Sequence, residues 1–325
     1  MTYELVEYCE RWRDQWDDFI ENAQGTVLQT RGFLDYHGER FAEQSILVKN
    51  EKNKIIAVFP AASALDDFET VISHPGATFG GFVTNFRPNP QVIEDIFKQV
   101  INHYRRSGFL NMQYISAPSY ATRHQDQSDL FVLRKLNANF IACGLWSVVN
   151  LKQPRPRKKT LASSIRKAVQ HGVKAEVIED AESYKNFYAL LTENLKDRHN
   201  SYPTHSFKEF TNLAQRLEDK SKLILAYSKN MSLLAGVWLI NYSPGVWHTQ
   251  YIASNQQGRE LNATHFLIDD IIEILRKNGE THLSLGTSNN PGGDVDNQLF
   301  HFKSGFGGDA VTNWKVVLSL KERLI

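Results

Sequence analysis

The sequence predicts an α/β fold with mixed α+β sheets, arranged as two domains in tandem. A length of 325 residues corresponds to about two domains of ordinary size. An apolar share of 42% is enough for hydrophobic cores, and a charged share of 22% is ordinary for a globular protein. Strand-like and helix-like segments alternate along the chain, which is the pattern of α/β folds.

Two parts of the chain share one pattern, which we interpret as an internal duplication. Apolar residues recur at helical spacing in residues 92–104, and a similar stripe occupies residues 267–275. Both stripes end on paired cations followed by a glycine, Gly108 or Gly279, as helix ends often do. Amphipathic helices with such ends also occur singly. Strand-like runs follow the two stripes at residues 109–115 and 281–285 and precede them at 70–73, 80–83 and 246–252.

We expect the domain boundary near residue 150. The run QPRP at residues 153–156 interrupts regular structure, because proline removes a backbone donor and holds its predecessor extended. The predicted domains are therefore residues 1–150 and 151–325. Further helices are expected at about 161–170, from Ser183 to Leu195, and after Ser206, which has capping-box spacing to Glu209.

Charge and cysteine content exclude several classes of protein. The 37 basic and 36 acidic residues leave a net charge of +1, which gives no overall field for nucleic acid or an anionic membrane, although local patches could bind either. With only Cys9 and Cys143 present, neither a disulfide framework nor a cysteine metal site is expected. HExxH and other metal-ligand spacings are also missing, so we expect no metal.

We expect a cytoplasmic protein. The N-terminal segment is charged throughout and lacks the apolar centre of a signal peptide. No stretch reaches the roughly 20 apolar residues that a membrane-spanning helix needs, so no membrane association is expected. Whether the chain forms a homo-oligomer is left open by the sequence.

The segment 251–263 suits a phosphate. It leads from a predicted strand into a helix, where free backbone N–H groups and the helix dipole attract anions. The run of Gln257, Gly258 and Arg259 is compact enough to bring backbone close to an anion, and Arg259 adds positive charge. GxxxxGK and GxGxxG are both absent. A capped turn without a ligand has the same pattern.

QGRELNA at residues 257–263 resembles the acyl-CoA loop of GNAT acyltransferases. Other motifs are similar to the FemAB-like branch, whose members are two GNAT units in tandem. The resemblance extends from Trp16 to Val317, and Glu260 and Asn262 depart from it because the usual GNAT loop has glycines there. The FemAB-like motifs are SHPGATFGG at residues 73–81, HTQY at 248–251, RH at 198–199, PTH at 203–205, Gly286, Asn297, Lys303 and FG at 306–307.

The resemblance implies acyl transfer from a CoA thioester to an amine. Such a site needs a neutral amine, donors for the oxyanion and a proton source for the leaving thiolate. GxSxG is absent and neither cysteine has a recognisable nucleophile setting, so we expect direct transfer without a covalent enzyme intermediate. The residues implied to bind acyl-CoA are Tyr251, Ile252, Gln257, Gly258, Arg259, Asn262, Ala263, Asn297 and Lys303.

His248 and Tyr251 are the candidate catalytic residues. Strand alternation predicts His248 and Gln250 on one face, with Thr249 and Tyr251 on the other. His248, whose ordinary pKa is near 6.5, could accept the amine proton, and Tyr251 could give a proton to the thiolate. Alternatively, His248 is a hydrogen-bonded strand residue and Tyr251 only packs.

Two loops are candidates for binding the acceptor. Polar and aromatic residues at 198–205 lie between predicted helices, and three glycines surround an aromatic residue at 74–81. Ordinary turn chemistry or a bulged hairpin explains the same patterns. The predicted substrate-binding residues are His74, Thr78, Phe79, Gly80, Gly81, Arg198, His199, Tyr202, His205 and Gln250.

The preferred hypothesis is an N-acyltransferase that acylates a nucleotide-linked amino sugar for a bacterial surface polysaccharide. Residues 152–174 contain eight Lys or Arg and no acidic residue, which attracts phosphates of a nucleotide sugar, CoA or tRNA, although a solvated face looks alike. The alternative is a Fem-type aminoacyltransferase that uses aminoacyl-tRNA to build peptidoglycan cross-bridges. A third hypothesis is a binding module with a decayed cofactor site.

Overall fold

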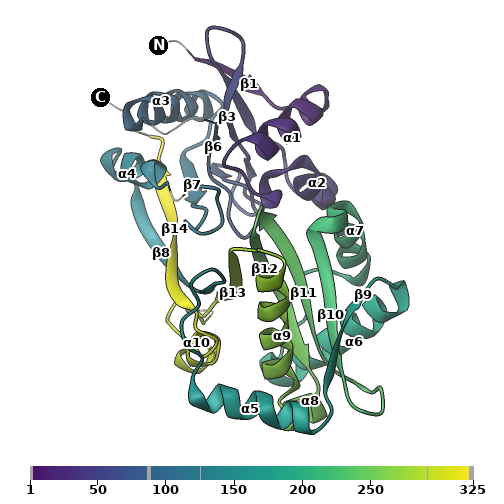
Figure 1. Ribbon diagram of the computed structural model, residues 1–325. Coiled ribbons are helices and arrows are strands. Elements are labelled where there is room, and N and C mark those ends of the chain that lie inside the picture. Colours follow the sequence, from purple (N-terminus) through teal and green to yellow (C-terminus); the bar gives the residue numbers. More distant parts are fainter. Residues whose placement is uncertain (1–2, 86–88, 125, 291, 322–325) are drawn as a thin grey trace. The chain divides into compact units, whose positions relative to one another are not determined.

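The computed structural model describes residues 3–85, 89–124, 126–290 and 292–321, which form two compact units (Figure 1). The first unit comprises Met1–Leu145 and Val311–Ile325, and the second comprises Trp146–Ala310. The C-terminal residues therefore belong with the first unit, whereas the sequence predicted them in the second. The reason is that β14 (Asp309–Ser319) pairs with β7 (Asn111–Ile115) through its residues 315–319.

The first unit contains two small sheets. One is antiparallel and has the order β1 (Glu4–Glu7), β2 (Ile46–Lys49), β3 (Ile55–Phe59), β6 (Val83–Thr84). The other has the order β4 (Ala62–Ser63), β5 (Thr70–Ile72), β7, β14, with β5 and β7 parallel. The α-helices are α1 (Arg13–Asn22), α2 (Arg31–Leu34), α3 (Pro90–Arg106) and α4 (Ser128–Lys135), and the short 3₁₀ helices are η1 (Glu10–Trp12), η2 (Val27–Gln29) and η3 (Asp35–Arg40).

The second unit contains one mixed sheet. Its order is the end of β8 (Asn139–Asn150), β13 (His282–Thr287), β12 (Val246–Ser254), β11 (Leu233–Ser243), β10 (Ser221–Tyr227), β9 (Lys174–Ile178). Only β12 and β13 pair in parallel among these strands. The helices are α5 (Lys159–Gln170), α6 (Ala181–His199), α7 (Phe207–Leu217), η4 (Glu218–Lys220), α8 (Gln256–Glu260), α9 (Ala263–Lys277) and α10 (Asn297–Ser304).

The core of the second unit lies between the sheet and α9, which runs along the strands in Figure 1. The apolar stripe predicted at 267–275 supplies Leu267 and Ile271, both fully buried. They belong to one cluster with Val237 and Leu239 of β11. Burial of this stripe explains why a segment with helical periodicity folds against these strands.

The predicted duplication is confirmed at the level of the fold. In the first unit, α3 lies in the chain between β5 and its parallel neighbour β7. In the second unit, α9 lies between β12 and its parallel neighbour β13. Gly108 and Gly279 follow the two helices with φ of 93° and 80°, in the left-handed region that a glycine adopts readily.

The helices predicted in the second half are also confirmed. α5 and α6 include the predicted ranges, and α7 begins after Ser206, whose side chain accepts from the Glu209 N–H in a complete capping box. The run at 80–83 is not a strand as predicted, because β6 contains only Val83–Thr84.

Candidate active site

The parallel strands β12 and β13 separate partway along the sheet. Pairing begins at Val246 with His282 and ends at His248 with Ser284, whereas β12 continues to Ser254. Main-chain groups of β12 beyond His248 that face this side therefore have no partner strand in β13. Such groups are free to bind a ligand laid along the strand edge.

A cavity of about 450 Å³ lies at the end of β12. The walls come from the last residues of β12, from α8 and the start of α9, from the end of α6, and from α10 and the residue before it. The lining residues are Asn194, Arg198, Ile252, Ala253, Ser254, Gly258, Arg259, Asn262, Thr264, His265, Asp296, Gln298, Leu299, Phe302 and Lys303.

The electrostatics of this cavity favour an anion. Arg198, Arg259 and Lys303 line it, and Asp296 is the one acidic residue among its lining residues. Asn262 precedes α9, and its side chain makes no capping hydrogen bond to this helix start. The first N–H groups of α9 and the positive end of its dipole are therefore available to phosphate oxygens.

Close packing requires a glycine at position 258. A Cβ atom there would lie 2.1 Å from the carbonyl oxygen of Leu234, closer than any real contact. The Gly258 N–H donates to Asn255 Oδ1 at 2.7 Å, which starts α8. α8 is thereby held directly against the end of the sheet, and the predicted compact turn is a short helix.

The two departures from the usual GNAT loop are compatible with this geometry. Glu260 is exposed, accepts a hydrogen bond from Gln256 Nε2 at 3.0 Å, and is not among the residues that line the cavity. Asn262 has φ 57° and ψ 30°, the left-handed conformation that asparagine tolerates better than most residues. Neither residue prevents an anion from binding.

Five of the predicted cofactor-binding residues line this cavity: Ile252, Gly258, Arg259, Asn262 and Lys303. Of the others, Gln257 and Asn297 are exposed outside it, and Ala263 is fully buried in the core. Tyr251 directly precedes Ile252 on β12 but does not line the cavity.

Several lining residues were missed by the sequence analysis. Asn194 is one helical turn before Arg198, and this i, i+4 spacing on one helix face was a usable signal. Thr264 and His265 lie in the first turn of α9, directly after the candidate anion-binding segment, so their position in the sequence was also a usable signal. The contributions of Asp296, Gln298, Leu299 and Phe302 depend on tertiary packing and leave no local signal.

A bulge in β12 changes which side chains share a face. Tyr251 lies opposite Trp238 of β11, but the next partner along β12 is Thr249, so Gln250 is an extra residue. The extra residue shifts the alternation by one, and Tyr251 lies on the face of His248, with its ring stacked on Trp238. The prediction that Thr249 and Tyr251 share a face is therefore wrong, whereas a shared face for His248 and Gln250 stays a prediction.

His248 is deeply buried. Its ring stacks on Tyr242 with the centroids 4.8 Å apart, and its Nδ1 lies 3.2 Å from Ser284 Oγ. Burial, with a smaller contribution from the charge of Lys303, lowers the pKa of His248 to about 3. The imidazole is therefore neutral at neutral pH and holds a proton only weakly.

Lys303 lies close to His248 at the wall of the cavity. Its Nζ donates to the carbonyl oxygen of Thr287, and burial lowers the pKa of Lys303 to about 8. A Cβ at Gly286 would lie 3.5 Å from His248 Cε1 and 3.6 Å from Lys303 Nζ. This main-chain position therefore adjoins both side chains.

The loop between α6 and α7 brings His205 to Tyr251. The Tyr251 hydroxyl oxygen lies 2.6 Å from His205 Nδ1, and His205 is buried. Tyr202 in the same loop is 70% exposed, and Gln250 at the bulge is half-buried. Arg198 lines the cavity, whereas His199 ends α6 with a side chain outside the described residues.

The predicted acceptor loop of the first unit packs on its own neighbours. A Cβ at Gly80 would lie 1.9 Å from the Ser73 carbonyl oxygen, and Gln29 Nε2 donates to the Gly80 carbonyl oxygen at 2.8 Å. Phe79 is fully buried, and a Cβ at Gly81 would lie 2.7 Å from the Tyr114 hydroxyl. These contacts account for both glycines without a ligand, and acceptor binding by this loop stays a prediction.

His74 and Thr78, two further predicted residues of this loop, differ in burial. His74 is buried with a φ of 56°, and burial, then the nearby His37, lowers the pKa of His74 to about 4. Thr78 is exposed.

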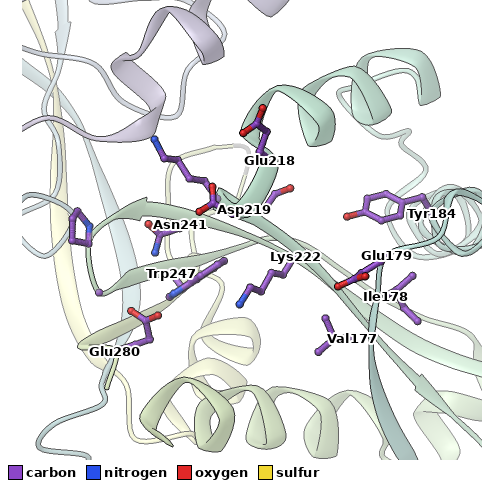
Figure 2. A pocket seen from close by; sticks show the side chains of 14 residues that line it. Val177, Ile178, Glu179, Tyr184, Glu218, Asp219, Lys222, Asn241, Trp247 and Glu280 are labelled. Carbon is purple, nitrogen blue, oxygen red and sulfur yellow. The ribbon is translucent and has the colours of Figure 1, made fainter. Parts of the chain in front are cut away.

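A larger hollow of about 740 Å³ lies elsewhere in the second unit (Figure 2). Lys222, Asn241 and Trp247 from three adjacent strands line it, with Lys222 Nζ 5.1 Å from the centre of the Trp247 ring. Glu280, beyond the C-terminal end of α9, lines it as well. This hollow contains none of the predicted site residues and shares no lining residue with the 450 Å³ cavity.

Within residues 3–85, 89–124, 126–290 and 292–321, no group of three or more His, Cys, Asp or Glu is arranged to hold a metal ion. Over the same residues, none of the helices has the length and apolar character needed to cross a membrane.

Each unit places a helix between two parallel strands, and in the second unit a cationic cavity lies where that strand pair separates. This is the architecture expected of a tandem GNAT fold. Residues 155–303 match the family described as "Acetyltransferase (GNAT) domain". No curated protein matches the chain in sequence.

Solved structures show the same architecture over nearly the whole chain. The structure of FemX has 13% identity and a TM-score of 0.71, with 96% of each chain covered. L-PGS from Bacillus licheniformis has 13% identity and a TM-score of 0.64, covering 95% of this chain and 92% of that one. A tandem GNAT protein of the clavulanic acid pathway has 10% identity and a TM-score of 0.58, with 99% of each chain covered. The chain thus has a FemAB-like tandem GNAT fold, and residues 155–303 of it match a GNAT acetyltransferase domain.

Proposed function

We propose that the second unit transfers an acyl group from an activated donor directly to an amine. The observation that carries this proposal is the 450 Å³ cavity, which joins the unpaired edge of β12 to the uncapped start of α9. The anionic part of the donor binds at α9 and Arg259, and the acyl carbonyl lies along β12. Free main-chain N–H groups of that strand polarise the carbonyl.

Lys303 supplies positive charge beside the reacting group. Its side chain is buried and lines the same cavity, so its interaction with a developing negative charge is weakly screened by water. A pKa lowered to about 8 leaves Lys303 mostly charged at neutral pH and able to give up its proton at modest cost.

We propose an aminoacyl-tRNA as the donor. The similarity to FemX and L-PGS supports aminoacyl transfer better than the nucleotide-sugar acceptor preferred from sequence.

The basic segment 152–174 is the proposed contact for the tRNA backbone. Arg155 pairs with Asp309 and Arg157 with Asp269, so these two cations brace the fold. Five others are exposed and have no carboxylate partner among the described residues. They are Lys152, Lys159, Arg166, Lys167 and Lys174.

This segment adjoins the cavity. α5 packs on α9, and Lys158 Nζ lies 3.1 Å from His301 Nδ1 on α10. Both α9 and α10 contribute lining residues to the cavity. A nucleic acid bound along α5 would thus lie close to the elements that hold the acyl group.

A second candidate is transfer from acyl-CoA to a nucleotide-linked amino sugar. The match to a GNAT acetyltransferase domain and the uncapped start of α9, which suits a diphosphate, favour this donor. The structural similarities support this acceptor less than they support aminoacyl transfer.

The test offers both donor classes to the purified chain. One arm contains total tRNA charged with radiolabelled amino acids and a panel of amines, including peptides with a free lysine. The other arm contains acetyl-CoA with a nucleotide-linked amino sugar, and free thiol is measured. Label transfer that ribonuclease pretreatment abolishes supports aminoacyl transfer. Thiol release without label transfer establishes the second candidate, and no transfer in either arm contradicts the proposed function.

A further inference from the structure

We propose that His205 and Tyr251 act together as the base that takes the proton of the attacking amine. This inference rests on the proposed acyl transfer. The Tyr251 hydroxyl oxygen is 2.6 Å from His205 Nδ1, and the two rings meet edge to face at 82° with centroids 5.8 Å apart. A phenol at this distance donates its hydrogen to the unprotonated nitrogen of a neutral imidazole.

The position of His205 is fixed on both sides. The Tyr188 hydroxyl donates to the His205 carbonyl oxygen at 3.0 Å. The next residue, Ser206, caps α7: its N–H donates to Glu209 Oε2 at 2.7 Å, and its hydroxyl oxygen accepts from the Glu209 N–H at 3.3 Å. The loop therefore holds the imidazole in place before any substrate arrives, as a catalytic base requires.

The bulge at Gln250 puts the Tyr251 side chain on the face of β12 opposite α9, where it meets His205. Trp247 and Ile252 pack with the α9 core, whereas His248 and Tyr251 lie on the opposite face. Ile252, the residue after Tyr251, already lines the donor cavity. Tyr251 itself does not line this cavity, and we place the attacking amine on the Tyr251 side of β12, facing a carbonyl that lies along the strand edge.

The hydrogen bond to His205 decides what Tyr251 can do. Because its own hydrogen points at Nδ1, the phenolic oxygen can only accept from other groups. Thr204 and the main chain at residues 204–205 hydrogen-bond to it, and the amine replaces one of these donors when it gives up its proton. Tyr251 then takes part in deprotonating the nucleophile, in place of the sequence expectation that it protonates the leaving group. His248 is a poorer candidate for the base, since it is enclosed by aromatic rings and its pKa is lowered to about 3.

The step balances as follows. The amine nitrogen forms a bond to the acyl carbon, and one N–H proton passes to the Tyr251 oxygen as the phenolic proton passes to His205 Nδ1. The electron pair of the breaking bond leaves with the oxygen or sulfur of the donor, which takes up a proton from water. The His205 imidazolium returns its proton to water after each turnover.

The experiment compares two nucleophiles in three variants. Tyr251→Phe removes the relay oxygen, and His205→Asn keeps an acceptor near Nδ1 that cannot take the proton. Tyr227→Phe, on β10, is the matched control. Single-turnover transfer from whichever donor the wild type uses is measured against pH, first with an alkylamine and then with hydroxylamine, which is uncharged at neutral pH.

We expect both pair variants to lose about 10²–10⁴-fold in rate with the alkylamine, as for loss of a general base. With hydroxylamine the loss should shrink to less than tenfold, donor KM should be unchanged, and the acidic limb of the pH profile should flatten in His205→Asn. The control should match the wild type in every measurement.

Equal losses with both nucleophiles, or a raised donor KM, would assign the pair a structural role and overturn the inference. The same nucleophile-dependent loss in His248→Gln, with both pair variants active, would assign the base to His248. If the wild type transfers from neither donor class, the failure lies with the proposed function itself.

Discussion

The guanidinium of Arg259 donates a hydrogen bond to the carbonyl oxygen of Ser254 at 2.8 Å, so that the short helix α8 is fastened to the end of β12. Asn194 Nδ2 donates to the same oxygen at 2.7 Å from α6. Three elements of the cavity wall therefore meet at one carbonyl group. Arg259 both positions the loop and places a positive charge on the cavity.

The neighbours Arg259 and Glu260 provide a matched pair of variants. Arg259→Ala removes a cation and a brace of the cavity, so donor affinity should fall by roughly 10-fold or more, as expected for a charge-assisted contact of about 1.5–3 kcal/mol. Glu260→Ala removes an exposed side chain that is not part of the wall and should change donor affinity less than twofold. Donor-induced thermal stabilisation measures both. Equal effects would place the donor elsewhere.

A substitution series at Asn262 tests the backbone conformation before α9. Asn262→Gly should leave the free energy of unfolding within about 0.5 kcal/mol, because glycine adopts the left-handed region without strain. Asn262→Val should cost about 1–2 kcal/mol, because a branched Cβ crowds the backbone there. Urea unfolding is the measurement. The control is Asn278→Val at the other end of α9, where φ is −79° and only a weak propensity effect is expected.

The basic segment can be tested through the salt dependence of tRNA binding. Replacing both Arg166 and Lys167 with glutamine should weaken binding and lower the slope of log K against log salt by about one per lost phosphate contact. The control removes the same charge from the first unit, with Lys52→Gln and Lys54→Gln, and should leave the slope unchanged. A slope equally reduced by both pairs would indicate a non-specific charge effect.

Helices and their ends could be predicted from the sequence, because each depends on residues that are close together in the chain. The stripe at 267–275 and the glycine at 279 specify a helix and its end, and Ser206 with Glu209 specifies another start. The candidate anion-binding turn could also be located from the sequence, since a cation and a glycine precede an amphipathic helix.

Features that depend on strand pairing were not predictable in this way. The bulge at Gln250 arises from the register of β12 against β11, and no residue type in the HTQY motif predicts it. The approach of His205 to Tyr251 joins positions 46 residues apart, so it depends on how the α6–α7 loop packs. The return of β14 to the first unit is likewise a pairing between distant segments.

The lowered pKa of His248 predicts that the folded chain loses stability in acid. Its pKa is about 3 in the folded chain and near 6.5 when unfolded, so the unfolded state binds more protons below pH 6.5. The contribution of His248 to the free energy of unfolding is fully present above pH 6.5. It decreases as the pH falls, by about 1.5 kcal/mol between pH 6.5 and 5. In His248→Gln this part of the decrease should be missing. Urea unfolding at pH 7.5, 6.5 and 5 measures it, and the value at pH 7.5 separates lost packing from lost titration. An identical decrease in both proteins would show that the imidazole is not kept neutral by the fold.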